Sequence, residues 1–428
     1  MQKNITDYIF KNDVLHYESH LKGFTESSFQ SLDSKSKELD LELKIDDLLT
    51  GKVINFTENQ AAWHPKYRTK FDSIPATRKS KSEYKNVVTL GIGGSFEGPK
   101  LLIESFHDSD PNINHIFITG SDAYEFKDKV SNLNPDETIF IISSKSFTTD
   151  ETLEALREAI KWSGNMEKFI AITANKEEAA KYNIEEIIEF DKEIGGRYSI
   201  WSDINLPALY GPKSNFDPKL FLKGGHQADL DIQNNSDYLN FIKILSFSDI
   251  WFNNFAGKNT RAVLSYSWKL RSFANYAQQL EMESLGKHPN QNSEYKNTGQ
   301  IIFGGYGPTA QHSYFQLMHQ GTQNICADII ASKEETKSLA FAQAITQAKL
   351  LSFGAENLLK EEEKINGNIP TNLFLLNTID SFTLGYLIAT WEHRTFVSSV
   401  MLEINPFDQF GVSAGKMFTK KYLEDNGG

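Results

Sequence analysis

The sequence predicts an α/β protein made of two consecutive modules, each a mainly parallel β-sheet flanked by helices. From residue 86 onward, short apolar runs alternate with longer segments of helical spacing. Buried parallel strands are near-continuous apolar runs that helices connect. A stretch rich in glycine and proline, at 206–225, divides the alternation into two series and indicates a domain junction. Since single domains hold roughly 100–200 residues, a chain of 428 residues has room for both modules.

The part of the chain before this alternation is different in character. Residues 1–60 are polar and favour helix, so we expect an N-terminal helical segment there, followed by a first module at 61–215. Helix-like segments such as TLEALREAIKWSG separate the strands of this module. The expected strands are NVVTL from residue 86, INHIFITG at 113–120, TIFIISS at 138–144 and KFIAITAN at 168–175.

The second module is expected at 236–428, including a C-terminal helix. Two of its segments, 268–286 and 333–353, have helical character. Its expected strands are RAVLSYS at 261–267, GQIIFGG at 299–305 and NICADIIA at 324–331. We therefore expect one mainly parallel sheet in each module.

Composition narrows the classes of function. The net charge of −12 argues against nucleic-acid binding, because the phosphate backbone would be repelled. Cys326 is the single cysteine, so a disulfide within the chain is excluded. The N-terminus lacks the pattern of a signal peptide, and no run approaches the roughly 18 apolar residues of a membrane helix. We therefore expect a cytoplasmic protein with no membrane partner.

Two loops at predicted strand ends are candidates for binding an anion. Parallel sheets bind ligands at the carboxyl ends of their strands, where helix N-termini favour negative charge. In GIGGSFEGPK, at 91–100, Gly93 and Gly94 would allow close backbone approach, and Ser95 adds a hydroxyl. In SSKSFTTDET, at 143–152, phosphate oxygens could be bound by Ser144, Lys145, Ser146 and Thr149.

Each loop also has a reading without a ligand. The first is then a tight turn between a strand and a helix. The second is then an N-cap, although capping normally uses one or two hydroxyls rather than the five present from Ser143 to Thr149. Neither loop matches the dinucleotide or P-loop fingerprint.

Three further segments contain candidate chemical groups. Arg197, in GGRYSIWS, is either a surface residue or a residue whose guanidinium donates hydrogen bonds to an oxyanion. Gln279 and Glu283 lie four residues apart, on one face of a predicted helix whose carboxylates could equally be solvated. His312 and His319 could be hydrogen-bonded core residues, and no nearby carboxylate or third histidine completes a zinc pattern. We expect no metal.

Taken in order, these segments resemble the glucose-6-phosphate isomerase family. The blocks that carry the resemblance are GIGGS, SSKSFTTDET, GGRYSIWS, QQLEMES-GK, QHSYFQLMHQGT and NPFDQFGVSAGK, which together span 91–416. The family consists of two sugar-isomerase (SIS) domains, each a parallel sheet flanked by helices. The resemblance implies reversible isomerisation of D-glucose 6-phosphate and D-fructose 6-phosphate through an enediol(ate), in glycolysis and gluconeogenesis, with no cofactor.

The resemblance also implies a role for each matched residue. Glu283 would be the catalytic base, and Arg197 would lie beside the reacting carbons. His312 and Lys416 would handle ring opening, with the histidine supplied by the neighbouring subunit of an obligate homodimer. The substrate and its phosphate would be bound by Gly94, Ser95, Ser144, Lys145, Ser146, Thr149, Gln279 and Gln409.

The chain departs from the family pattern at several positions. Ser146 replaces the usual threonine but keeps a hydroxyl. Before His312 the chain has GGYGPTAQH where the family usually has GEPGTNGQH. Leu285 stands where asparagine is usual, and Glu97 where an apolar residue is more common. These differences leave the surroundings of His312, and with them substrate preference, open.

Two alternative functions remain at this stage. One is an isomerase that also accepts mannose 6-phosphate, since both substrates share an enediol. The other is a non-catalytic SIS module that binds a sugar phosphate. Such a module needs the loop at 144–149 but not Glu283, His312 or Lys416.

Overall fold

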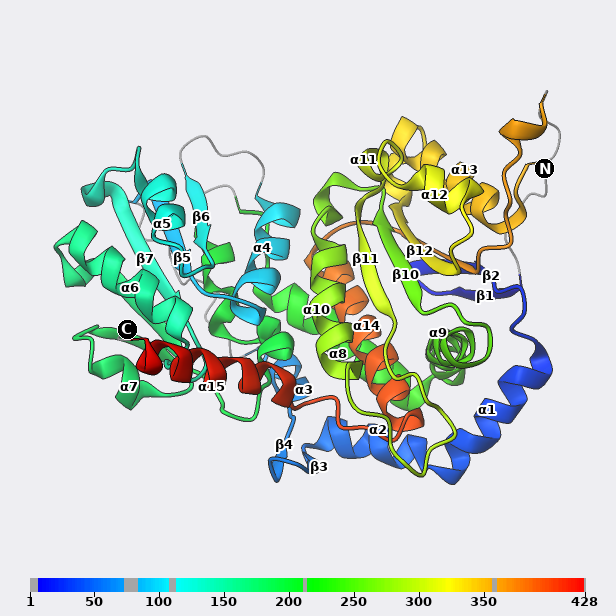
Figure 1. Ribbon diagram of the computed structural model, residues 1–428, viewed down its shortest axis with the longest axis horizontal. Helices are drawn as coiled ribbons and strands as arrows, with labels where there is room; N and C mark the ends of the chain where they lie inside the picture. The colour runs from blue at the N-terminus through cyan, green and yellow to red at the C-terminus, as the bar shows by residue number, and fades with distance from the viewer. Residues whose placement is uncertain (1–6, 73–83, 108–112, 211–213, 356–359, 427–428) are drawn as a thin grey trace.

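The computed structural model describes residues 7–72, 84–107, 113–210, 214–355 and 360–426. It contains two large sheets that lie side by side, with α4 (Gly94–Phe106) and α10 (Phe273–Leu285) between them (Figure 1). Helices cover both sheets. This confirms the prediction of a two-module α/β fold.

The first sheet has five strands, and all neighbouring pairs are parallel, in the order β6-β5-β7-β8-β9. Alternate residues of its strands enter two different cores: Phe140 and Ile142 pack on one face, and Ile139 and Ile141 on the other. Burial on both faces is the physical reason for the continuous apolar runs. The strands are β5 (Asn86–Leu90), β6 (Asn114–Ile118), β7 (Thr138–Ser143), β8 (Phe169–Thr173) and β9 (Glu186–Glu189).

The second sheet has six strands in the order β1-β2-β13-β12-β10-β11. The pairs among β10 to β13 are parallel, whereas β2 is antiparallel to both β1 and β13. The strands are β1 (Tyr8–Lys11), β2 (Leu15–His20), β10 (Thr260–Ser265), β11 (Ile301–Tyr306), β12 (Ile325–Ser332) and β13 (Thr371–Leu376).

The N-terminal segment differs from the helical segment predicted for 1–60. Its described part contains α1 (Glu26–Glu38) and α2 (Leu41–Thr50), but β1 and β2 precede these helices and a small hairpin of β3 (Val53–Asn55) and β4 (Gln60–Ala61) follows them. Leu15 and Tyr17 are fully buried in β2. Strand β2 pairs on one side with β1 and on the other with β13, a distant segment, and local composition does not reveal the second partner.

The glycine-rich stretch at 206–225 is only partly a junction. Its second half forms the start of α8 (Pro218–Asn234), which packs against α14 (Ser381–Met401). A Cβ on Gly224 would lie 1.9 Å from the backbone oxygen of Phe382, and one on Gly385 would lie 2.0 Å from that of Phe221. These glycines therefore allow two helices to approach closely, rather than breaking a helix.

The remaining helices cover the sheets or lie between them. Two segments predicted as single helices each begin with a 3₁₀ turn, which precedes α10 and α13. The helices are α3 (Pro65–Arg68), α4 (Gly94–Phe106), α5 (Ala123–Val130), α6 (Asp150–Ser163), α7 (Lys176–Ala180), α9 (Ser236–Phe255), α10 (Phe273–Leu285), α11 (Gly307–Ala310), α12 (Phe315–Gln320), α13 (Leu339–Phe353) and α15 (Phe410–Asp425). Within the described ranges, no helix combines the length and apolar character needed to span a bilayer.

Helix α15 is unusual because none of its side chains is buried. It leaves the half of the molecule that holds the second sheet and lies beside the half that holds the first (Figure 1). The C-terminal helix predicted for the second module thus reaches the first.

Candidate active site

A cavity of about 540 Å³ lies where the carboxyl ends of β5, β7 and β8 meet α10 and α15. Open parallel sheets bind ligands at this edge. Ten of the twelve predicted site residues line it: Gly94, Ser95, Ser144, Lys145, Ser146, Thr149, Gln279, Glu283, Gln409 and Lys416.

The loop at 144–149, which lines this cavity, contains a residue in an unusual backbone conformation. Phe147 has a φ of +54°, which is rare for a bulky residue, and its side chain is 1% exposed in the core of the first sheet. Its backbone N–H donates to the Ser144 hydroxyl at 3.2 Å. Packing of the Phe147 ring thus holds a strained loop in place.

The helix that follows this loop begins without a side-chain cap. Thr149 is the N-cap residue of α6, but its hydroxyl makes no capping hydrogen bond. Simple N-capping therefore does not account for the hydroxyl cluster. The N-cap of α4, Gly93, also provides no side-chain bond. Two helix N-termini thus meet one cavity, an arrangement that favours an anion.

The glycine loop at 91–95 brings α4 against the segment that carries Arg197. Gly93 has a φ of +60°, a conformation that favours glycine. A Cβ on Gly94 would lie only 1.8 Å from the backbone oxygen of Gly196. Close approach to an anion stays a prediction, and this backbone contact is a second reason for glycine at 94.

Arg197 is buried behind the cavity wall, with 2% of its surface exposed. Its Nη1 lies 3.0 Å from Oε1 of Glu283 and donates to Oε1 of Gln409, also at 3.0 Å. Its Nε donates to the Ser284 hydroxyl at 2.8 Å. Its Nη2 donates to the backbone oxygens of Pro406 and Asp408, at 2.5 and 2.9 Å. All five N–H donors of the guanidinium are therefore used, which fixes its plane.

Glu283 is the carboxylate at the centre of this arrangement. Its Oε1 faces Arg197, and its Oε2 accepts a hydrogen bond from Nε2 of Gln279 at 3.1 Å. The side chain is 24% exposed, so a ligand in the cavity can reach it. The spacing of four residues on α10 places Gln279 and Glu283 side by side, as predicted.

Positive charge gathers around the loop at 144–149. Burial lowers the pKa of Lys145 below its ordinary value, an effect that Glu58 opposes and Arg197 adds to. Lys192 and Lys416 line the same cavity. An anionic group bound there would meet cations from three separate segments.

The structure does not bring His312 to this cavity. It is exposed, and it follows α11 on the half that holds the second sheet. His319 is half-buried, and its Nε2 lies 2.8 Å from Oε1 of Gln347, so it is a hydrogen-bonded core residue. In the described part of the chain, no group of three or more His, Cys, Asp or Glu residues is arranged to hold a metal ion.

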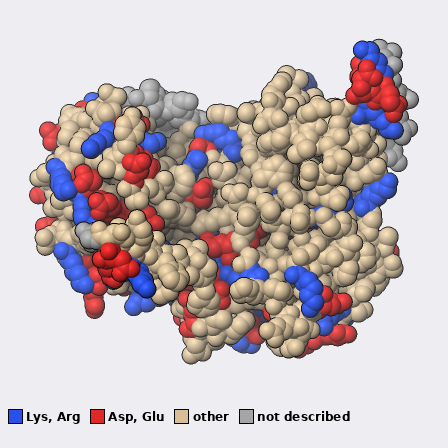
Figure 2. All heavy atoms as spheres, in the orientation of Figure 1, with Lys and Arg blue, Asp and Glu red and all other residues tan. Residues whose placement is uncertain are grey.

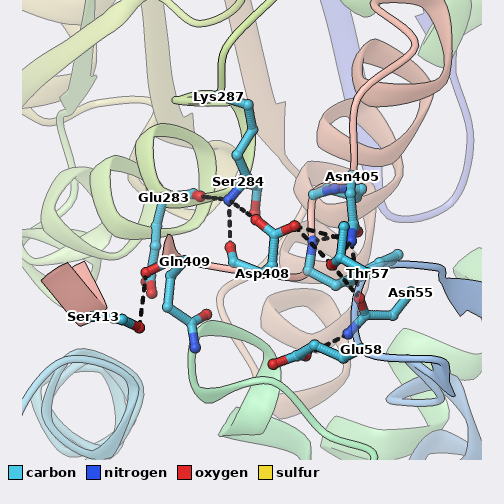
Figure 3. A network of polar contacts seen from close by, with 12 residues as sticks. Asn55, Thr57, Glu58, Glu283, Ser284, Lys287, Asn405, Asp408, Gln409 and Ser413 are labelled. Atoms are coloured by element: carbon cyan, nitrogen blue, oxygen red, sulfur yellow. Dashed lines mark hydrogen bonds and ion pairs between the residues drawn. The ribbon is translucent and has the colours of Figure 1, made fainter. Parts of the chain in front are cut away.

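Several residues that sequence reasoning missed belong to the site. Gln60, Asn175 and Lys192 line the cavity, and no motif in the sequence marks them. Lys287 and Asp408 lie just behind it (Figure 3). Both residues belong to family blocks quoted above, Lys287 to QQLEMES-GK and Asp408 to NPFDQFGVSAGK. Membership of these blocks is the sequence feature by which they could have been found.

Comparison with known proteins gives a consistent result. The family model described as "Phosphoglucose isomerase" matches residues 76–426. A glucose-6-phosphate isomerase of Wigglesworthia glossinidia brevipalpis is 33% identical over 474 residues, which cover 96% of this chain and 86% of that protein. One from Legionella pneumophila (strain Paris) is 35% identical over 418 residues, covering 89% of this chain and 83% of that protein.

A solved structure supports the fold. The crystal structure of a glucose-6-phosphate isomerase from Chlamydia trachomatis superimposes with a TM-score of 0.87 at 22% identity. The match covers 100% of this chain and 92% of that one.

Proposed function

This chain belongs to the phosphoglucose isomerase family, and we propose that its cavity interconverts D-glucose 6-phosphate and D-fructose 6-phosphate through an enediolate. The enzyme is an aldose–ketose isomerase. One observation carries the catalytic proposal: Glu283, which lines the same cavity as the loop at 144–149, lies 3.0 Å from the guanidinium of Arg197.

The phosphate of the substrate binds at that loop. The hydroxyls of Ser144, Ser146 and Thr149 replace water around the dianion, and Lys145 supplies charge. Lys192, which also lines the cavity, adds a second cation. Because this anchor lies away from the reacting carbons, its contribution is orientation of the sugar.

Proton transfer falls to Glu283. A carboxylate can remove the proton from C2 and return it to C1, so one group serves both halves of the reaction. The enediolate between these steps carries negative charge, which the fixed guanidinium of Arg197 stabilises. Gln279 and Gln409 hold the carboxylate and the guanidinium in place through the hydrogen bonds described above.

Ring opening requires a donor and an acceptor at O1 and O5, and Lys416 is one of them. The second is His312, which we propose comes from the partner in a homodimer. A further cavity of about 730 Å³, which Glu283 and Gln409 also line, provides space for a partner segment. The exposed apolar side chains of α15, such as Phe418 and Tyr422, are also available for a partner. On the face drawn in Figure 2, the surface over α11 and α12 carries few charged side chains, as interface cores do.

The decisive experiment on catalysis is Glu283→Gln. Its amide oxygen can still accept from Arg197, so the geometry is kept while the base is lost. We expect kcat to fall by about 10²–10⁴-fold and binding of a sugar phosphate to persist. Glu335→Gln, an exposed carboxylate on the opposite half, is the matched control. Near-normal turnover by Glu283→Gln would refute the assignment of the base.

The shared site is tested by mixing two inactive variants. Random reassociation of Glu283→Gln with His312→Gln makes half of the dimers mixed, and each mixed dimer then holds one intact site. Recovery of about a quarter of wild-type activity is expected from this symmetry. No recovery would mean that the histidine acts within its own chain or not at all.

The two alternative functions are a module that only binds sugar phosphate and an isomerase that also accepts mannose 6-phosphate. A module that only binds sugar phosphate does not require a carboxylate such as Glu283, which Arg197 and Gln279 hold in a fixed position. Turnover with mannose 6-phosphate is measured directly in the same assay, with glucose 6-phosphate as the reference.

A further inference from the structure

A polar network beneath the active site joins segments that are far apart in the sequence. It links the hairpin of β3 and β4, the end of α10 and the loop at 405–409 that precedes α15 (Figure 3). At its centre is the carboxylate of Asp408, a residue only 6% exposed. No step of the proposed reaction uses this carboxylate.

The contacts of Asp408 fix the loop at 405–409 from three sides. Its Oδ2 accepts from the Thr57 hydroxyl at 2.9 Å and from Nδ2 of Asn405 at 3.1 Å. Its Oδ1 lies 3.2 Å from Nζ of Lys287. Asn405 also donates to Oδ1 of Asn55 at 2.9 Å, which ties the loop to the hairpin a second time.

The backbone of the same loop holds the catalytic guanidinium. The carbonyl oxygens of Pro406 and Asp408 both accept from Nη2 of Arg197. The next residue, Gln409, accepts from Nη1. Three of the five guanidinium contacts therefore come from a loop whose position depends on the Asp408 carboxylate.

Lys287 extends the same arrangement to the catalytic base. Its Nζ donates to the backbone oxygen of Glu283 at 2.8 Å, at the end of α10, and to the backbone oxygen of Asp408. The side chain is 14% exposed, and burial lowers its pKa, an effect to which Arg197 adds and which Asp408 opposes. Without the carboxylate, a largely buried cation would lose its charge partner.

We propose that Asp408 is a positioning residue, whose carboxylate, paired with Lys287 and Thr57, fixes the loop carbonyls that aim Arg197 at Glu283. This inference rests on the proposed isomerase function. It predicts that Asp408 affects the chemical step and not the phosphate anchor, which belongs to β7 and α6. A displacement of about 1 Å at a reacting group costs roughly 100-fold in rate.

The test compares Asp408→Asn with two milder changes. Asp408→Asn removes the charge but keeps the shape, and we expect kcat to fall about 10- to 100-fold with KM within about threefold. Thr57→Val removes the hydroxyl that donates to Asp408 and accepts from Nδ2 of Asn405 at 2.7 Å. A fall of about three- to tenfold is expected from the loss of these hydrogen bonds. Thr57→Ser, which keeps that donor, should restore kcat. Thr50→Val, an exposed threonine on α2, is the matched control.

Inhibitor binding separates positioning from a merely structural role. A reduced sugar phosphate, which lacks the carbonyl, reports on the phosphate anchor, and its affinity should stay within about twofold. A sugar-acid phosphate, whose carboxylate mimics the enediolate, should lose affinity by about the same factor as kcat/KM. Lys287→Met combined with Asp408→Asn should cost less than the product of the single effects, because both act on one contact.

Two results would overturn the inference while leaving the proposed function in place. One is kcat within twofold of wild type in a folded Asp408→Asn or Thr57→Val variant. Another is equal loss of affinity for both inhibitors, which would show general disruption. If Asp408→Asn does not fold, Thr57→Val and its serine rescue decide the matter. Absence of turnover by the wild-type chain would instead refute the proposed function, and this inference with it.

Discussion

Replacing Gly94 with alanine tests whether the contact between α4 and the segment at 195–197 positions Arg197. The added Cβ would lie 1.8 Å from the backbone oxygen of Gly196, and such atoms essentially never approach within 3.0 Å. The backbone must therefore give way by at least 1.2 Å (3.0 − 1.8). Arg197 follows directly in the chain, and its contact with Glu283 is only 3.0 Å long.

The size of this shift sets the expected loss of activity. A misplacement of about 1 Å costs roughly 100-fold, so kcat should fall by about that factor. Overpacking of this kind also lowers the free energy of unfolding, by about 1–3 kcal/mol. The assay couples formation of glucose 6-phosphate from fructose 6-phosphate to a dehydrogenase, and chemical denaturation measures stability.

The control is Gly415→Ala, since a Cβ at this position of α15 meets nothing within 4 Å. It should leave kcat unchanged and should not lower the free energy of unfolding, since alanine favours a helix interior over glycine by about 1 kcal/mol. If Gly94→Ala keeps kcat within threefold of wild type, α4 relaxes without moving Arg197. Gly94 would then have no part in positioning Arg197.

Two further predictions concern single side chains. Lys145→Met should raise KM about 10- to 100-fold, because a charge-assisted hydrogen bond to phosphate is worth roughly 1.5–3 kcal/mol; an unchanged KM would place the phosphate elsewhere. Burial lowers the pKa of Lys145, so its positive charge is lost as pH rises through this lowered value. The wild-type KM should therefore rise with pH before an ordinary lysine would titrate, and Lys145→Met should lack this rise. Burial raises the pKa of the Cys326 thiol to about 12, so thiol reagents should label it only as fast as the chain unfolds. Labelling within seconds of a chain that stays folded would contradict this.

The central strands of the first sheet, β5, β7 and β8, could be predicted from the sequence because they are buried on both faces. Each such strand, for example Thr138–Ser143, is a local apolar run with a polar loop after it. The edge strand β9 is only partly buried, lacks such an apolar run and was not predicted. The strand at Leu15–His20 could not be predicted in this way. Besides β1, its hydrogen-bond partner is β13, a distant segment that nothing within the local sequence specifies.

The residues of the site that are close in sequence could also be predicted, whereas contacts between distant residues could not. The loop at 144–149 and the pair Gln279 and Glu283 are visible because their members are close in sequence. The contact between Thr57 and Asp408 joins residues 351 positions apart, so the spacing of residues along the sequence does not reveal it. Glycine at 224 and 225 suggests a break in the chain, and only the packed partner shows that these residues lie inside a helix.

The position of β1 and β2 in the second sheet has a consequence for synthesis of the chain. The Tyr17 hydroxyl donates to Oδ1 of Asn372, which is 355 residues away. Ribosomes add about 5–20 residues per second, so the first strands wait roughly 20–70 s for β13 to be made. During that interval Leu15 and Tyr17, which are fully buried in the finished protein, have no sheet to join. The five-stranded sheet, made entirely from residues 86–189, can close earlier, so the half that contains the first strands is completed last.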